Sequence, residues 1–185
     1  MSTITHKSWT EYFSYNPESG NLVWKHRPEH LFKSKRAFAA WNANYEGKVA
    51  GHNQPAGAGS ARYVRVWNKM HRAHRIIWEM HNGPIPKGLV IDHINGNFYD
   101  NRISNLRLAT QSQNGMNRLL SKANKLRIKG VSWDRDRKKF KAVISVSGKI
   151  IQLGRFDIKA LAASAYAKGS LMHHGTFSPF YRKSA

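Results

Sequence analysis

Apolar and polar positions divide the chain into three stretches. In residues 1–60, an aromatic segment from Trp9 to Tyr15 is followed by a turn-forming run from Asn16 to Asn21 and by a strand pattern at Leu22-Val23-Trp24. This order predicts an N-terminal β-rich extension. Its aromatic residues fit a small core better than a platform on which nucleic-acid bases would stack.

Residues 61–118 have the densest apolar pattern. Tyr63 to Trp67 predicts a strand, and His74 to Met80 has apolar residues at helical spacing, closed by prolines. Leu89 to Ile91 is a short apolar strand that runs directly into Asp92-His93. The tight-turn signal Asn95-Gly96 follows, so Asp92 and His93 are predicted to lie at a strand end.

The third stretch reads as three strands and a helix. Residues 119–128 form a basic linker, and residues 129–185 follow it. Between Lys139 and Val146 the alternation is strict. Phe140 and Ile144 share one face, and Lys141 and Ser145 share the other. An Ala-rich helix then runs from 158 to about 172.

Charge indicates the class of partner. The chain has 31 Lys and Arg against 10 Asp and Glu, a formal net charge of +21. Such an excess favours a polyanionic partner, most commonly DNA or RNA. An anionic membrane would require a basic amphipathic helix or a long apolar run, and neither is found, so no membrane partner is expected.

Composition also limits the compartment and the metal chemistry. The first residues, MSTITHKSWTEYF, contain no apolar signal core, which argues against export. The absence of cysteine excludes disulfides and thiolate zinc sites. We expect an intracellular, cytoplasmic protein, in the host cytoplasm if a phage encodes it.

The segment from Val90 to Arg118 contains the candidate chemistry. Cutting a phosphodiester requires a base for the attacking water and a cation on the scissile phosphate. Asp92 offers a hard oxygen ligand suited to magnesium or manganese, and Asn114 can add a neutral amide oxygen from a following helix. His93, with an intrinsic pKa of about 6.5, can accept a proton near neutral pH.

This segment resembles the H-N-H, or ββα-metal, nuclease family, and specifically its homing-endonuclease branch from phages and introns. The resemblance runs from about Tyr63 to Arg118. It implies that His93 is the general base and that one divalent cation is held by Asp92 and Asn114. It further implies that Asn105 is the middle Asn, which pins the loop and orients the backbone of the histidine.

Two positions modify what the resemblance implies. Asn114 stands where the family letters have a second histidine, which favours Mg²⁺, with Mn²⁺ as the alternative, over Zn²⁺. Arg118 stands where some relatives have a third histidine, and we expect it to contact phosphate. His74 is more readily structural or phosphate-touching than catalytic, and Asp100 fits a polar loop better than a metal site.

Residues 129–180 resemble a second family, the plant ethylene-response-factor or APETALA-type DNA-binding domain. The resemblance rests on Lys129-Gly130-Val131, Phe140 to Ile144, Leu153 to Phe156, Ala165-Tyr166 and His174-Gly175. It implies a three-stranded antiparallel sheet packed on one helix, with the exposed sheet face in the major groove. The DNA-facing positions that it implies are Lys129, Ser132, Arg135, Arg137, Lys141, Ser145 and Gln152.

Some details of this second resemblance stay open. Position 132 is Ser where the plant pattern has a basic residue, and position 152 is Gln where it has Trp, so base preference is not inherited. Trp133 could stack on DNA or pack under the sheet. The cations could also serve only to keep the sheet soluble, although the charge of +21 favours binding.

The sequence therefore predicts an α+β chain with an N-terminal β-rich region, a central ββα-metal nuclease fold and a C-terminal sheet packed on one helix. The predicted function is metal-dependent hydrolysis of phosphodiester bonds in double-stranded DNA, without a small-molecule cofactor, by a monomer or weak dimer. The alternatives are a non-catalytic sequence-specific DNA-binding regulator and an RNA-binding protein. Neither alternative explains Asp92, His93, Asn105 and Asn114 together.

Overall fold

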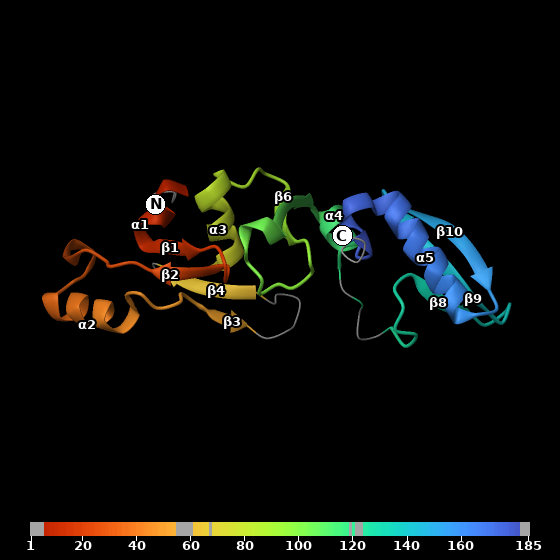
Figure 1. Ribbon diagram of the computed structural model, residues 1–185, viewed down its shortest axis with the longest axis horizontal. Coiled ribbons are helices and arrows are strands. Elements are labelled where there is room, and N and C mark those ends of the chain that lie inside the picture. The colour runs from red at the N-terminus through yellow and green to blue at the C-terminus, as the bar shows by residue number, and fades with distance from the viewer. Residues whose placement is uncertain (1–5, 55–60, 67, 119, 121–123, 182–185) are drawn as a thin grey trace. The chain divides into compact units, whose positions relative to one another are not determined.

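A computed structural model of the chain describes residues 6–54, 61–66, 68–118, 120 and 124–181, with the backbone alone at residues 6–8 (Figure 1). The chain divides into two compact units. The first unit comprises residues 1–93 and 97–108, and the second comprises residues 94–96 and 109–185. Both units contain helices and strands, which confirms the expectation of a mixed chain. The division falls inside the expected core of residues 61–118, and the domain boundaries stay predictions.

The first unit begins with a helix and a hairpin. Helix α1 (His6–Tyr12) leads into strands β1 (Phe13–Asn16) and β2 (Asn21–Trp24), which pair antiparallel. The side chain of Asn16 accepts a hydrogen bond from the backbone N–H of Ser19 at 2.9 Å, as expected of a turn-forming Asn. Gly20 closes the turn with φ +69°, a conformation that favours glycine.

The stretch expected to be β-rich is mixed. After β2 come the 3-10 helix η1 (Glu29–Leu31) and helix α2 (Lys35–Tyr45). Helix α2 begins where the hydroxyl of Ser34 accepts a hydrogen bond from the backbone N–H of Ala37. Trp41 of α2 packs edge-on against Trp24, with ring centroids 5.3 Å apart. The apolar pattern of α2 is made by aromatic residues among small and basic ones, so its helical period is weak.

A three-stranded sheet and a helix complete the scaffold of the first unit. Strands β3 (His52–Gln54), β4 (Ala61–Val66) and β5 (Lys69–Arg72) form an antiparallel sheet in the order β3-β4-β5. Helix α3 (Ala73–Asn82) follows β5 directly and buries Ala73, His74, Ile76 and Ile77. Within the residues that the structure describes, no helix is both long and apolar enough to cross a membrane.

One core joins the N-terminal stretch to the segment with the candidate chemistry. The members of this core come from α1, the β1–β2 hairpin, β4, α3, β6 (Leu89–His93) and β7 (Leu106–Thr110). Its buried residues include Trp9, Phe13, Leu22, Trp24, Val64, Ile76, Ile77, Ile91 and Leu106. The N-terminal aromatic residues therefore stabilise the segment with the candidate chemistry by packing, and the core interpretation of them is confirmed.

The second unit contains helix α4 (Gln111–Met116) and a sheet packed on a helix. Strands β8 (Val131–Asp134), β9 (Lys139–Val146) and β10 (Lys149–Phe156) form an antiparallel sheet in the order β10-β9-β8. Helix α5 (Lys159–His174) covers one face of it (Figure 1), and the 3-10 helix η3 (Gly175–Phe177) follows. The buried core of this unit consists of Val131, Ala142, Ile144, Ala162 and Tyr166.

Candidate active site

Strand β6 delivers Asp92 and His93 to its carboxyl end. The strand pairs with β7, and its last three residues are buried, with Asp92 3% and His93 2% exposed. Beyond the strand, Gly96 has φ +71°, as the predicted tight turn requires. Two ionisable residues thus occupy adjacent, buried positions at a strand end.

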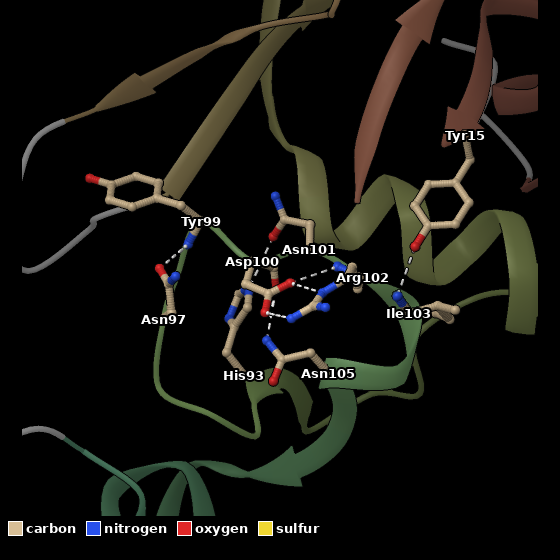
Figure 2. A network of polar contacts seen from close by, with 9 residues as sticks. All are labelled: Tyr15, His93, Asn97, Tyr99, Asp100, Asn101, Arg102, Ile103 and Asn105. Atoms are coloured by element: carbon tan, nitrogen blue, oxygen red, sulfur yellow. Dashed lines mark hydrogen bonds and ion pairs between the residues drawn. The ribbon is translucent and has the colours of Figure 1, made fainter. Parts of the chain in front are cut away.

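The ring of His93 is held by a buried amide. Its Nε2 lies 2.9 Å from Oδ1 of Asn101, which is itself 1% exposed (Figure 2). Because a carbonyl oxygen only accepts hydrogen bonds, Nε2 must donate, so the neutral ring has its basic lone pair on Nδ1. Burial lowers the pKa of His93 below the ordinary 6.5, against the opposing effects of the Asn101 bond and the Asp92 charge. The side chain is therefore a neutral base at neutral pH.

A second histidine packs against the first. The rings of His74 and His93 meet edge to face, with centroids 5.0 Å apart and planes at 88°. Burial, and then the neighbouring His93, lowers the pKa of His74 to about 3. The Nδ1 atom of His74 is buried and has no hydrogen-bond partner in the structure. His74 is thus an uncharged side chain that packs against His93, which agrees with a structural role rather than a catalytic one.

The loop that provides Asn101 is fixed at several points (Figure 2). Asp100 pairs with Arg102 at 2.6 Å, and its backbone carbonyl accepts a hydrogen bond from Nδ2 of Asn105 at 2.7 Å. The backbone N–H of Ile103 donates to the hydroxyl of Tyr15 at 2.8 Å, which ties the loop to the N-terminal hairpin. Asn105 thus donates a hydrogen bond to the loop, and its predicted roles in pinning the loop and orienting the histidine backbone stay predictions.

The hairpin also contacts this loop at Gly20. A methyl group on Gly20 would lie 2.5 Å from the backbone nitrogen of Arg102, so only glycine allows the close approach. The N-terminal stretch therefore supports the candidate site directly.

Asp92 takes part in an ion pair that the sequence did not reveal. Nε and Nη2 of Arg107, on β7, donate to Oδ2 of Asp92 at 2.9 and 2.7 Å. The side chains are 17% and 4% exposed, respectively. Opposite charges on neighbouring strands often form ion pairs. The sequence alone could not predict this pair, because it does not show that β6 pairs with β7.

The other candidate residues of this motif belong to the second unit. Asn114 is half-buried on α4, which begins with a reciprocal cap between Thr110 and Gln113, and Arg118 is exposed after it. The convergence of Asn114 on Asp92 and His93 stays a prediction. Among the described residues, no group of three or more His, Cys, Asp or Glu side chains is arranged to hold a metal ion.

The predicted DNA-facing residues of the C-terminal sheet occupy three places. Ser132, Lys141, Ser145 and Gln152 lie on the strands, where Ser132 is directly opposite Lys141. Arg135 and Arg137 are exposed in the β8–β9 turn. Lys129 is different, because its ammonium donates to the backbone carbonyls of Met116 and Arg118 at 2.7 and 2.8 Å. DNA contact at all seven stays a prediction.

Two further side chains of this sheet alter its description. Arg155 lies opposite Lys141 and binds the Asp134 carboxylate at 2.9 Å, which lowers the pKa of that carboxyl. Trp133 lies opposite Phe140, and their ring centroids are 4.7 Å apart. Since Phe140 packs on the core under α5, Trp133 packs on that side of the sheet while remaining 46% exposed.

Comparison with known proteins agrees with the site. Residues 71–116 match the family of HNH endonucleases, so the chain contains an HNH endonuclease domain that includes α3, β6, β7 and α4. The chain belongs to the same family as Protein 3.8 of Escherichia phage T7, to which it is 37% identical over 112 residues. That alignment covers 60% of this chain and 92% of Protein 3.8.

A second relative is more distant. The chain is 32% identical over 108 residues to a protein named uncharacterized HNH endonuclease L560 of Acanthamoeba polyphaga mimivirus. The match covers 58% of this chain and 54% of that protein. No solved structure matches the chain. The expected HNH resemblance is confirmed, and the resemblance to the plant DNA-binding domain stays a prediction.

Proposed function

We propose that this protein is a metal-dependent, homing-endonuclease-like enzyme that hydrolyses phosphodiester bonds in double-stranded DNA. The observation that supports this most is the buried His93 at the end of β6, held by Asn101 with Nε2 protonated. Together with the HNH match over residues 71–116, this supports Nδ1 of His93 as the atom that accepts a proton from the attacking water.

The surroundings of His93 suit that step. A lowered pKa keeps the ring neutral and ready to accept a proton near pH 7. When the ring becomes charged, the hydrogen bond to the amide oxygen of Asn101 and the negative charge of Asp92 stabilise the imidazolium. Because His74 stays neutral, it adds no positive charge beside the imidazolium.

Asp92 and Asn114 are the residues that would hold the metal. Their donor atoms, a carboxylate oxygen and an amide oxygen, fit a hard cation such as Mg²⁺ or Mn²⁺ better than Zn²⁺. When bound, the cation supplies positive charge for the scissile phosphate and the leaving 3′ oxygen.

Attachment to DNA is assigned to cationic residues of the second unit. Arg118 follows α4, and Lys141 lies in a row with Ser132 and Arg155 across the face of the C-terminal sheet that is turned away from α5. One active site per chain nicks a single strand, so a double-strand break requires two visits or a dimer.

The test is cleavage of long duplex DNA in Mg²⁺ or Mn²⁺ by the wild type, His93→Ala and the matched control His30→Ala. His30 is an exposed histidine in η1 that does not contact the site. We expect His93→Ala to bind DNA in a salt-sensitive manner without cutting it, and His30→Ala to cut like the wild type. Intact DNA with every protein and metal would instead support a non-catalytic DNA-binding regulator.

A further inference from the structure

The carboxylate proposed as a metal ligand is already paired with a cation. Arg107 donates twice to Oδ2 of Asp92, and the Asp92 side chain is 4% exposed. The guanidinium of an arginine is a fixed positive charge. The carboxylate is therefore both oriented and neutralised by its neighbour on β7.

Burial makes this pair different from the other ion pair near the site. In the pair between Asp100 and Arg102, the Arg102 side chain is 50% exposed, and water and salt screen the charges. For Asp92 and Arg107, the low dielectric strengthens the interaction, and removing either partner takes an opposite charge away from the other in a buried place. Arg107 thus acts on whatever else approaches Asp92.

The net charge of the proposed ligand residues and their neighbour determines how strongly a divalent cation is attracted to the site. In the proposed ligand set, Asp92 contributes one negative charge and Asn114 none. The guanidinium of Arg107 cancels that charge at 2.7 Å. Divalent cations in phosphate-processing sites are usually held by one or two carboxylates together with substrate phosphates. The missing negative charge here is therefore that of the DNA phosphate.

We infer that Arg107 makes divalent-cation binding conditional on bound DNA, so that the ion and the substrate enter the site together. The inference rests on the proposed function. Arg107 is a positioning residue in this scheme, because it acts through Asp92 and fixes the carboxylate by two hydrogen bonds to one oxygen. A free protein that does not hold the ion cannot cut before DNA has docked.

The experiment measures Mn²⁺ uptake by electron paramagnetic resonance, using the full chain with and without duplex DNA. All proteins contain His93→Ala, so the DNA stays intact. Asp92→Asn in the same background serves as the blank for Mn²⁺ that binds DNA alone. The protein that carries His93→Ala and retains Arg107 is called the Arg107 protein. We expect it to take up Mn²⁺ in a manner that depends on Asp92 only when DNA is present.

Three variants separate charge from geometry. Arg107→Met should bind Mn²⁺ without DNA at least about tenfold more tightly than the Arg107 protein, because the repelling charge is gone. Arg107→Lys keeps a cation and should retain the DNA requirement. Arg65→Met is the control, since it removes an exposed arginine of β4 and should behave like the Arg107 protein.

Thermal unfolding gives a second readout, which also works for a weakened variant. Arg107→Met removes the guanidinium from the buried carboxylate of Asp92, so the variant should melt at a lower temperature than the Arg107 protein. Mn²⁺ without DNA should then raise its melting temperature, because a ligand that binds only the folded state stabilises it. The same addition should leave the melting temperature of the Arg107 protein unchanged.

Three results distinguish failure of the inference from failure of the proposed function. Equal Asp92-dependent uptake by the Arg107 protein with and without DNA overturns the inference and leaves the nuclease proposal standing. Uptake by Arg107→Met no tighter than that by Arg107→Lys also overturns it. If no protein in any arm shows uptake that depends on Asp92, both the inference and the proposed metal site are wrong.

Discussion

Replacing His74 by phenylalanine should make the first unit less sensitive to acid. His74 is 8% exposed and lies edge-on against His93, and phenylalanine preserves an aromatic ring at that position. Burial holds the pKa of His74 at about 3, whereas the unfolded chain has the ordinary 6.5. Between about pH 3 and pH 6.5, His74 binds a proton in the unfolded state but stays neutral in the folded state.

The sign and size follow from proton linkage. Because the folded pKa is depressed, the stability is complete above pH 6.5 and is lost as the pH falls towards 3. Each pH unit in that window costs about 1.4 kcal/mol, so lowering the pH from about 7 to about 5 costs about 2 kcal/mol through His74 alone. The phenylalanine variant has no proton to bind there and should not lose this contribution.

Urea unfolding at the two pH values measures the difference. Tryptophan fluorescence is a suitable probe, since Trp9, Trp24, Trp41 and Trp78 all lie in the first unit. A constant offset from the substitution cancels when the two pH values are compared, and histidines that do not contact His74 contribute equally to both proteins. If wild type and variant lose the same stability on acidification, the pKa of His74 is not depressed in the folded state, and the description of His74 as an uncharged side chain beside His93 is wrong.

Three further substitutions test other parts of the structure. Asn101→Ala removes the acceptor for Nε2 of His93 and should slow single-turnover cleavage at least about tenfold, with DNA affinity unchanged. An unchanged cleavage rate would refute the claim that Asn101 positions the ring. Gly20→Ala adds a methyl group at positive φ against the loop backbone and should lower the free energy of unfolding by about 2 kcal/mol or more, measured by urea, and no change would show that the loop yields easily. Lys141→Met should weaken DNA binding and reduce the slope of log affinity against log salt by about 0.9, whereas Lys168→Met, an exposed lysine of α5 away from that sheet face, should leave the slope unchanged. Equal slopes for both lysine variants would remove the sheet face from the interface.

Local patterns were sufficient to predict the strand end with the candidate chemistry. Leu89 to Ile91 is apolar, and Val90 and Ile91 are β-branched. Asn95-Gly96 can adopt the positive φ of a tight turn, so the strand could only end near His93. The alternation between Lys139 and Val146 likewise gave the faces of β9, because a period of two depends only on adjacent residues.

The partners of the site residues could not be derived in this way. Asn101 is eight positions beyond His93, and its side chain reaches the ring only because the loop is pinned by Tyr15, which is 88 positions from Ile103. Arg107 reaches Asp92 through the pairing of two strands. Such contacts depend on tertiary packing, of which a single sequence gives no direct signal.

Chemical rescue of His93→Gly tests the central claim most directly. The substitution removes the imidazole and leaves a space at a buried position, into which free imidazole can diffuse. Single-turnover cleavage of duplex DNA in Mg²⁺ or Mn²⁺ should be absent from this variant and should return as imidazole is added, while Asp92→Asn gains nothing from it. Cleavage by His93→Gly at the wild-type rate without imidazole would contradict the assignment of His93 as the base.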